Sequence, residues 1–106
     1  MKWISNYVFV AGERLKNHLV EIDADSRLMQ ITSLLDELAN TEYVPFALCV
    51  VSARRKRRLV SIFDNAASMD DFEQQFARAF ADDDNRKGRV VVAAIDFDDM
   101  RLRFLN

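Results

Sequence analysis

The stretch SMDDFEQQFARAF, residues 68–80, decides the class of fold because it reads as an amphipathic helix. Ser68 is a favoured N-cap, and the two aspartates after Met69 place negative charge in the first turn, where the helix dipole favours it. Apolar residues recur along one face of this helix: Met69, Phe72, Phe76 and Phe80. We therefore predict a helix that ends near Ala81 and packs this face into a core.

The segments around this helix carry strand patterns separated by turns. The strand predicted at 90–97 contains the continuous apolar run VVVAAI, which is typical of a central strand that is covered on both faces. Segments rich in aromatic, β-branched and other apolar residues predict further strands at 2–10, 15–23, 27–31, 43–53, 59–63 and 101–105. In the first of these, Trp3, Tyr7 and Phe9 have the same parity, so we expect them to share one face of the sheet.

A second, short helix is predicted at 34–39, where a capping Thr or Ser precedes closely spaced leucines. The resulting element order is β-β-β-α-β-β-α-β-β. It predicts an α+β fold in which two helices pack on a mostly antiparallel sheet. A length of 106 residues fits a single domain, so we assign 1–106 to one α+β domain.

The composition excludes several classes of protein. The formal charge is −2, whereas a general nucleic-acid binder carries a basic excess. No apolar run is long enough to span a bilayer, and the first residues do not resemble a signal peptide. The chain has one His, one Cys and two Gly. A single Cys cannot form an intrachain disulfide, so together with the missing signal peptide it predicts a cytoplasmic protein. The shortage of catalytic residue types predicts a non-enzymatic protein with no cofactor and no metal site.

The strongest local anomaly is a run of five cations, which we place at the tip of a hairpin between the strands at 43–53 and 59–63: Arg54, Arg55, Lys56, Arg57 and Arg58. Three interpretations remain open. The run is a solvated tip that prevents edge-to-edge aggregation, or it meets acidic residues such as 82–84 in this chain or in a second copy. Alternatively, it binds an anion or a nucleic acid.

Several other residues could carry chemistry. His18 could act as a general base, although the sequence shows no partner for it, and a packed or solvated strand histidine is the simpler interpretation. Cys49 lies in an apolar run, which favours a buried and unreactive thiol. Asp96 and Asp98 follow a strand and could bind Mg²⁺, but turns also favour Asp. The aspartates at 82–84 are interpreted as a solvated turn.

Several short segments suggest a family resemblance; they are residues 4–9, 15–23 and 27–31, followed by the pair 44–45. This succession resembles the N-terminal small β domain of metal-dependent amidohydrolases, in which a Val-Pro-Gly step leads into a strand with a His-x-His metal motif. Here Phe46 replaces the glycine, and Val51 and Ala53 stand at the two histidine positions. The resemblance covers 1–53 and implies a β scaffold without the metal motif, so it transfers no catalytic residue.

These observations predict a small, non-enzymatic protein-interaction domain that self-associates as a homodimer. Open sheet edges at 2–10 or 101–105 would be the contact surfaces. The alternative is a nucleic-acid or anion-binding module that uses the basic residues at 54–58. A third hypothesis is a divalent-metal enzyme that uses Asp96 and Asp98. No membrane partner is predicted.

Overall fold

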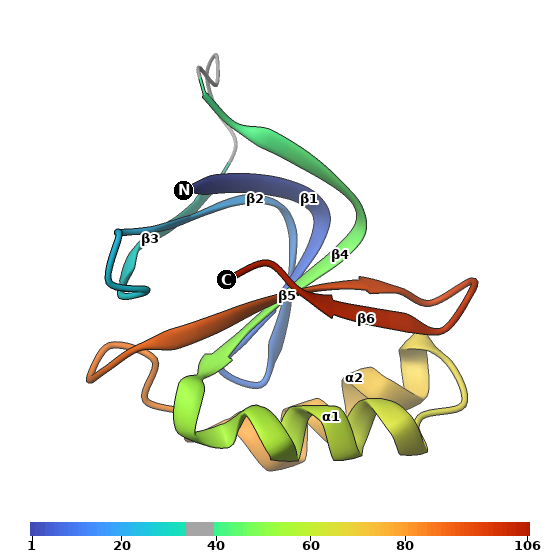
Figure 1. Ribbon diagram of the computed structural model, residues 1–106. Helices are drawn as coiled ribbons and strands as arrows, with labels where there is room; N and C mark the ends of the chain where they lie inside the picture. Colours follow the sequence, from blue (N-terminus) through green and yellow to red (C-terminus); the bar gives the residue numbers. More distant parts are fainter. Residues whose placement is uncertain (34–39) are drawn as a thin grey trace.

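The computed structural model describes residues 1–33 and 40–106, and its strands form one six-stranded sheet (Figure 1). In chain order the strands are β1 (Lys2–Val10), β2 (Glu13–Ile22), β3 (Leu28–Ser33), β4 (Glu42–Ser52), β5 (Val90–Asp96) and β6 (Arg101–Phe104). Their order in the sheet is β3-β2-β1-β4-β5-β6. Among the described strands only β1 and β4 pair in parallel, so the predicted α+β layout is confirmed, with a sheet that is mixed and mostly antiparallel.

The helices follow β4 directly, as η1 (Ala53–Arg55), α1 (Lys56–Asn65) and α2 (Met69–Phe80). The strand predicted at 59–63 is therefore wrong, because these residues lie within α1. Leu59, Ile62 and Phe63 are buried, and their spacing of three and four residues places them on one helix face. A five-residue apolar segment is too short to distinguish that spacing from a strand. The helix predicted at 34–39 lies outside the described residues.

Helix α2 is confirmed with the predicted start and end. The Ser68 hydroxyl accepts the backbone N–H of Asp71 at 3.2 Å, and the last helical residue is Phe80. In return, the Asp71 carboxylate accepts the backbone N–H of Ala67 at 2.9 Å. The N–H of Asp71, which the helix itself leaves without a partner, and the N–H of Ala67 just before the helix are thereby satisfied.

The two helices lie side by side beneath one face of the sheet (Figure 1). The core between the helices and the sheet is rich in aromatic rings, which contact one another in edge-on and stacked arrangements. Phe9 of β1 meets Phe72 at 5.1 Å and Phe76 at 5.8 Å between ring centroids, and Phe76 stacks on Phe80 at 5.0 Å. The predicted apolar stripe of α2 therefore forms the centre of this core.

Three neighbouring strands bend at the same level, and we call this line the crease: Asn17 on β2, Asn6 on β1 and Phe46 on β4. Asn17 has φ of 54° and Phe46 has φ of 73°. Asn6 lies where the register between β1 and β4 shifts, between Ser5 and Tyr7. One residue of β1 there faces two residues of β4, which is a β-bulge. The crease folds the sheet over itself, as the curvature of β1, β2 and β4 shows (Figure 1).

The crease also changes which residues share a face. Trp3 packs in one cluster with Val8 and Val10, whereas Tyr7 and Phe9 pack on the helix side. The expectation that Trp3, Tyr7 and Phe9 share a face is therefore wrong. A bulge interrupts the two-residue alternation on which that expectation depended.

Contacts between the β2–β3 turn and the start of β5 hold the two halves of the bent sheet together. Arg27 and Arg89 form an isolated antiparallel bridge, and the backbone N–H of Val90 donates to the carbonyl of Ser26 at 2.8 Å. The face opposite the helices is thus covered by the sheet itself.

Among the described residues, no helix has the length and apolar content needed to cross a membrane.

Candidate interaction surfaces

The basic run is not a hairpin tip, because Arg54 and Arg55 lie in η1 and the other three residues begin α1. Arg55 is half-buried and does not face solvent freely. Its guanidinium lies 4.4 Å from the ring centroid of Phe80 and donates to the carbonyl of Ala79. It also pairs with Asp82 at 3.3 Å and Asp83 at 3.4 Å. The predicted contact of the run with acidic residues of this chain is confirmed for Arg55.

Asp83 connects the end of α2 to the corner between β4 and η1. Its carboxylate is buried and accepts the backbone N–H of Ser52 at 3.0 Å, besides pairing with Arg55. A carboxylate in this position is stabilised by its donors, since burial alone would disfavour its charge. The interpretation of 82–84 as a solvated turn is therefore wrong for Asp83.

The other cations of the run remain at the surface. The Lys56 ammonium lies 4.2 Å from the ring centroid of Phe104. Arg54, Arg57 and Arg58 are exposed and form no ion pair within residues 1–33 and 40–106. Arg54 borders a hollow of about 350 Å³ that Asp84, Lys87 and Arg89 also line, and Lys87 pairs with Asp84 at 3.5 Å. We call the three exposed arginines of the run, Arg54, Arg57 and Arg58, the basic end.

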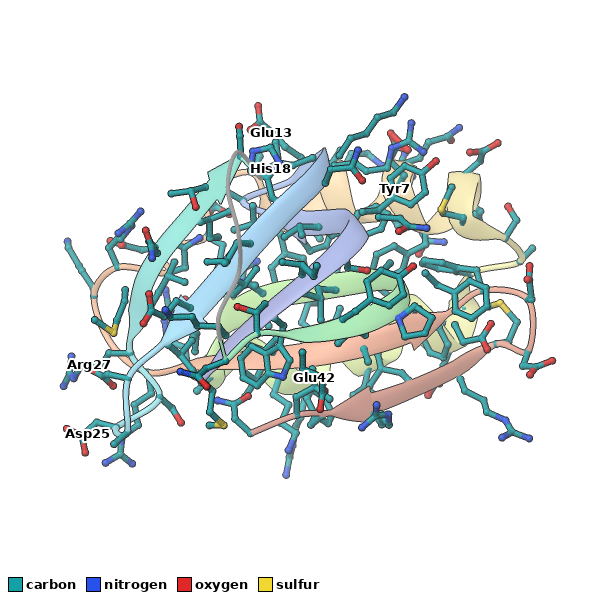
Figure 2. All side chains as sticks on the ribbon, turned by 90° about the horizontal axis from the view of Figure 1, so that it is seen from above. Tyr7, Glu13, His18, Asp25, Arg27 and Glu42 are labelled. Atoms are coloured by element: carbon teal, nitrogen blue, oxygen red, sulfur yellow. The ribbon has the colours of Figure 1, made fainter. Side chains whose placement is uncertain are left out.

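His18 lies on β2, as the strand pattern predicted, and is half-buried. Its Nδ1 donates to the carbonyl of Lys16 at 2.8 Å, which fixes the ring against its own strand. Figure 2 shows His18 on the rim of the molecule, away from the turn that carries Asp25 and Arg27. This position fits the simpler interpretation of a packed or solvated strand histidine, and the general-base role stays an untested hypothesis.

Cys49 is fully buried in the core between the sheet and the helices. Burial raises the pKa of its thiol, and the negative charge of Asp83 raises this pKa further. A thiol held in its neutral form is a poor nucleophile. The interpretation of Cys49 as a core residue is confirmed.

Asp96 ends β5 and organises the turn into β6. Its Oδ1 accepts the backbone N–H groups of Asp98 at 2.9 Å and Asp99 at 3.1 Å. Such bonds are typical of Asp at the start of a turn. Within the described part of the chain, no three His, Cys, Asp or Glu side chains gather closely enough to hold a metal ion.

The two edges of the sheet are β3 and β6. The segment 2–10, predicted as a possible open edge, is instead β1 and lies between β2 and β4. The segment 101–105 does contain the edge strand β6. Strand β3 has no charged residue, and Met29 at its start is 54% exposed. Strand β6 carries Arg101 and Arg103, both exposed.

The sequence did not predict the hollow of about 480 Å³ that lies beside the crease. We call it the crease hollow. It lies between the first half of β4 and the β5–β6 hairpin, and its lining includes Val44, Pro45 and Phe46. Phe46 is 40% exposed. A proline inside a strand pattern is a known sign of a bulge, so Pro45 was the signal available in the sequence.

Comparisons with protein-family models, with curated proteins and with solved structures found no match. The resemblance of residues 1–53 to an amidohydrolase β domain therefore stays a prediction.

Proposed function

We propose that this protein is a non-enzymatic protein-interaction domain that forms a homodimer by pairing its β3 edge with the β3 edge of a second copy. The observation that supports this proposal is the absence of charge along β3, whose sequence is LMQITS. The strand also has no proline, and its pairing with β2 is regular from Gln30 to Ser33, beyond the register shift at Met29. An edge strand without charges or proline is the kind that pairs with another strand. Two copies related by a two-fold axis would then form a continuous antiparallel sheet.

The composition of the two edges favours β3 over β6 as the dimer contact. In a two-fold pairing of β6, the side chains of Arg101 and Arg103 from both copies would gather on one face. Like charges directly opposite one another destabilise a strand pair. A two-fold pairing of β3 brings together only uncharged side chains, including the exposed Met29.

The test is a mass measurement by light scattering over a concentration series. We expect wild-type protein to approach twice its chain mass of 12.3 kDa at micromolar concentrations. The variant carrying Met29→Lys and Thr32→Lys should stay at 12.3 kDa, because like charges would then face each other across the edge.

A matched control carries two lysines at exposed helix positions, Ser61→Lys and Gln74→Lys, and should dimerise like the wild type. Both variants should unfold at similar urea concentrations, because all four positions are exposed. Wild-type protein that stays monomeric throughout the series would overturn the proposal. The same is true if the β3 variant and the control dimerise equally.

A second candidate function is the binding of an anion or a nucleic acid at the basic end. The supporting observation is that Arg54, Arg57 and Arg58 are exposed and have no acidic partner in the described residues. Binding to a short single-stranded DNA should weaken steeply as salt rises. Replacing these three arginines with serine should abolish it, whereas Arg101→Ser and Arg103→Ser should not. Arg55 is left intact because it holds the end of α2.

A further inference from the structure

We infer that the crease hollow binds an extended segment of a partner protein in which acidic side chains alternate with apolar ones. This inference rests on the proposal that the domain acts through protein contacts. It does not require dimerisation, because the crease hollow and the β3 edge are formed by different strands.

The floor and wall of the crease hollow are apolar. Val44 and Ala94 are buried beneath it, and Pro45 and Phe46 border it at the surface. A φ of 73° is rare for a bulky residue, and such conformations persist only where the surrounding structure enforces them. Here the bulge holds Phe46, which is 40% exposed beside the hollow. This arrangement offers an aromatic contact to an apolar side chain.

Two cations line the same hollow. Arg101 and Arg103 are two positions apart on β6, so they project from the same face of the sheet. Both are exposed, and neither forms an ion pair within residues 1–33 and 40–106. The one carboxylate in the lining, Asp96, already accepts the N–H groups of the β5–β6 turn.

The spacing of these arginines favours an extended ligand. Residues two apart on a strand are about 6.6 Å apart, in the partner as in β6. Carboxylates at alternate positions of an extended partner would therefore match Arg101 and Arg103. The intervening side chains would point the other way, and apolar ones there could contact Pro45 and Phe46.

The backbone of β4 also offers a place for a strand. Strand β5 pairs with β4 only from Ala47 to Ser52. In the described part of the chain, residues 42–46 therefore have no strand beside them on the β5 side. An extended partner can add to such an edge through main-chain hydrogen bonds, while its side chains provide specificity.

The test uses a short capped peptide in which glutamate alternates with valine, and its lysine–valine counterpart. Each is titrated into isotope-labelled protein, and backbone amide shifts are followed by NMR. We expect the glutamate peptide to move the amides of residues 43, 44, 46 and 101–103, and the lysine peptide to move neither set. Added salt should weaken the binding, because the contacts are ionic.

Two variants and a matched control test the assigned residues. Arg101→Ser with Arg103→Ser, and separately Phe46→Gly, should each weaken binding about tenfold or more. Glycine adopts the φ of Phe46 without strain, so the spectrum away from the crease should show an intact fold. The control, Arg57→Ser with Arg58→Ser, removes the same charge elsewhere and should bind normally.

The inference is overturned if the glutamate peptide fails to bind at millimolar concentration, or if both peptides bind equally. It is also overturned if the shifts map to the basic end or if the arginine variant binds like the control. Light scattering on the same samples reports dimerisation separately. A monomer that binds the peptide would contradict the homodimer proposal and leave this inference standing.

Discussion

The two faces of the sheet are covered in different ways, although each carries a continuous apolar cluster. Under the helices the core is aromatic, with Phe72 and Phe76 of α2 packed against Phe9 of β1. On the opposite face the cluster is mainly aliphatic and includes Val90 and Val92. No helix among the described residues covers that face; the sheet folds over it at the crease. One face is thus buried by helices whose pattern is local in the sequence. The other is buried by the bending of strands that lie far apart in the sequence.

The largest expected loss of stability comes from removing an aromatic ring from the core under the helices. Phe72 is fully buried, and its ring lies 5.1 Å from Phe9 and 5.4 Å from Phe97. We expect Phe72→Ala to lower the free energy of unfolding by about 3–5 kcal/mol. The control on the other face, Val92→Ala, removes fewer buried atoms and should cost about 2 kcal/mol. Urea denaturation measures both, and equal losses would contradict the difference we draw between the faces.

A smaller effect is expected where the β1–β2 turn meets α2. A Cβ on Gly12 would lie 2.8 Å from the Cα of Ala81 and 3.2 Å from the carbonyl oxygen of Ala77, and Gly12 has φ of 78°. These backbone atoms cannot move away without distorting α2 and the residue after it. Gly12→Ala should therefore lower the free energy of unfolding by about 2 kcal/mol.

The matched control is Gly88→Ala, where nothing lies within 4 Å of an added Cβ. We expect this change to leave the thermal midpoint within a few degrees of the wild type. If Gly12→Ala were equally well tolerated, the turn would not be packed against α2 as described.

On the folded-over face, Asn106 pairs with the backbone of β5. Its amide donates to the carbonyl of Val90 at 2.9 Å, and its Oδ1 accepts the N–H of Val92 at 2.7 Å. Asn106→Ala should cost about 1–2 kcal/mol and speed hydrogen exchange at the Val92 amide. The control Asn65→Ala removes one exposed bond to Ser61 and should have a smaller effect. Unchanged exchange at Val92 would contradict this pairing.

The smallest expected effect lies at the start of α2, on the helix-covered side. Ser68→Ala removes the bond to the Asp71 N–H and should cost about 1 kcal/mol in urea denaturation. The backbone N–H of Ala67, and then the Gln75 side chain, lower the pKa of Asp71.

This lowered pKa predicts the pH dependence of the cap. The contribution of Asp71 is complete above its unfolded pKa of about 3.9 and is lost as the pH falls through its lower folded pKa. Asp71→Asn should therefore be less stable than the wild type near neutral pH, and the difference should shrink in strong acid. A difference that is independent of pH would assign the effect to a cause other than the carboxylate.

The sequence predicted much of the helix-covered face because the relevant signals are local. Ser68 and the spacing of Phe72, Phe76 and Phe80 predicted α2, and the apolar run at 90–97 predicted β5. The same approach failed at 59–63, because a short apolar segment fits both a strand and a helix. Composition also identified the basic run, but it could not show that Arg55 turns inward onto Phe80.

The sequence by itself determined the α+β content, the core stripe of α2 and the charge of the edge strands. Only the tertiary structure decided that β1 is central, that β3 is an edge and that Phe46 stands exposed at a bulge. The physical reason is the range of the interactions. Helix spacing and capping act over a few residues, whereas strand order and the crease depend on pairing between distant segments, as where β1 meets β4.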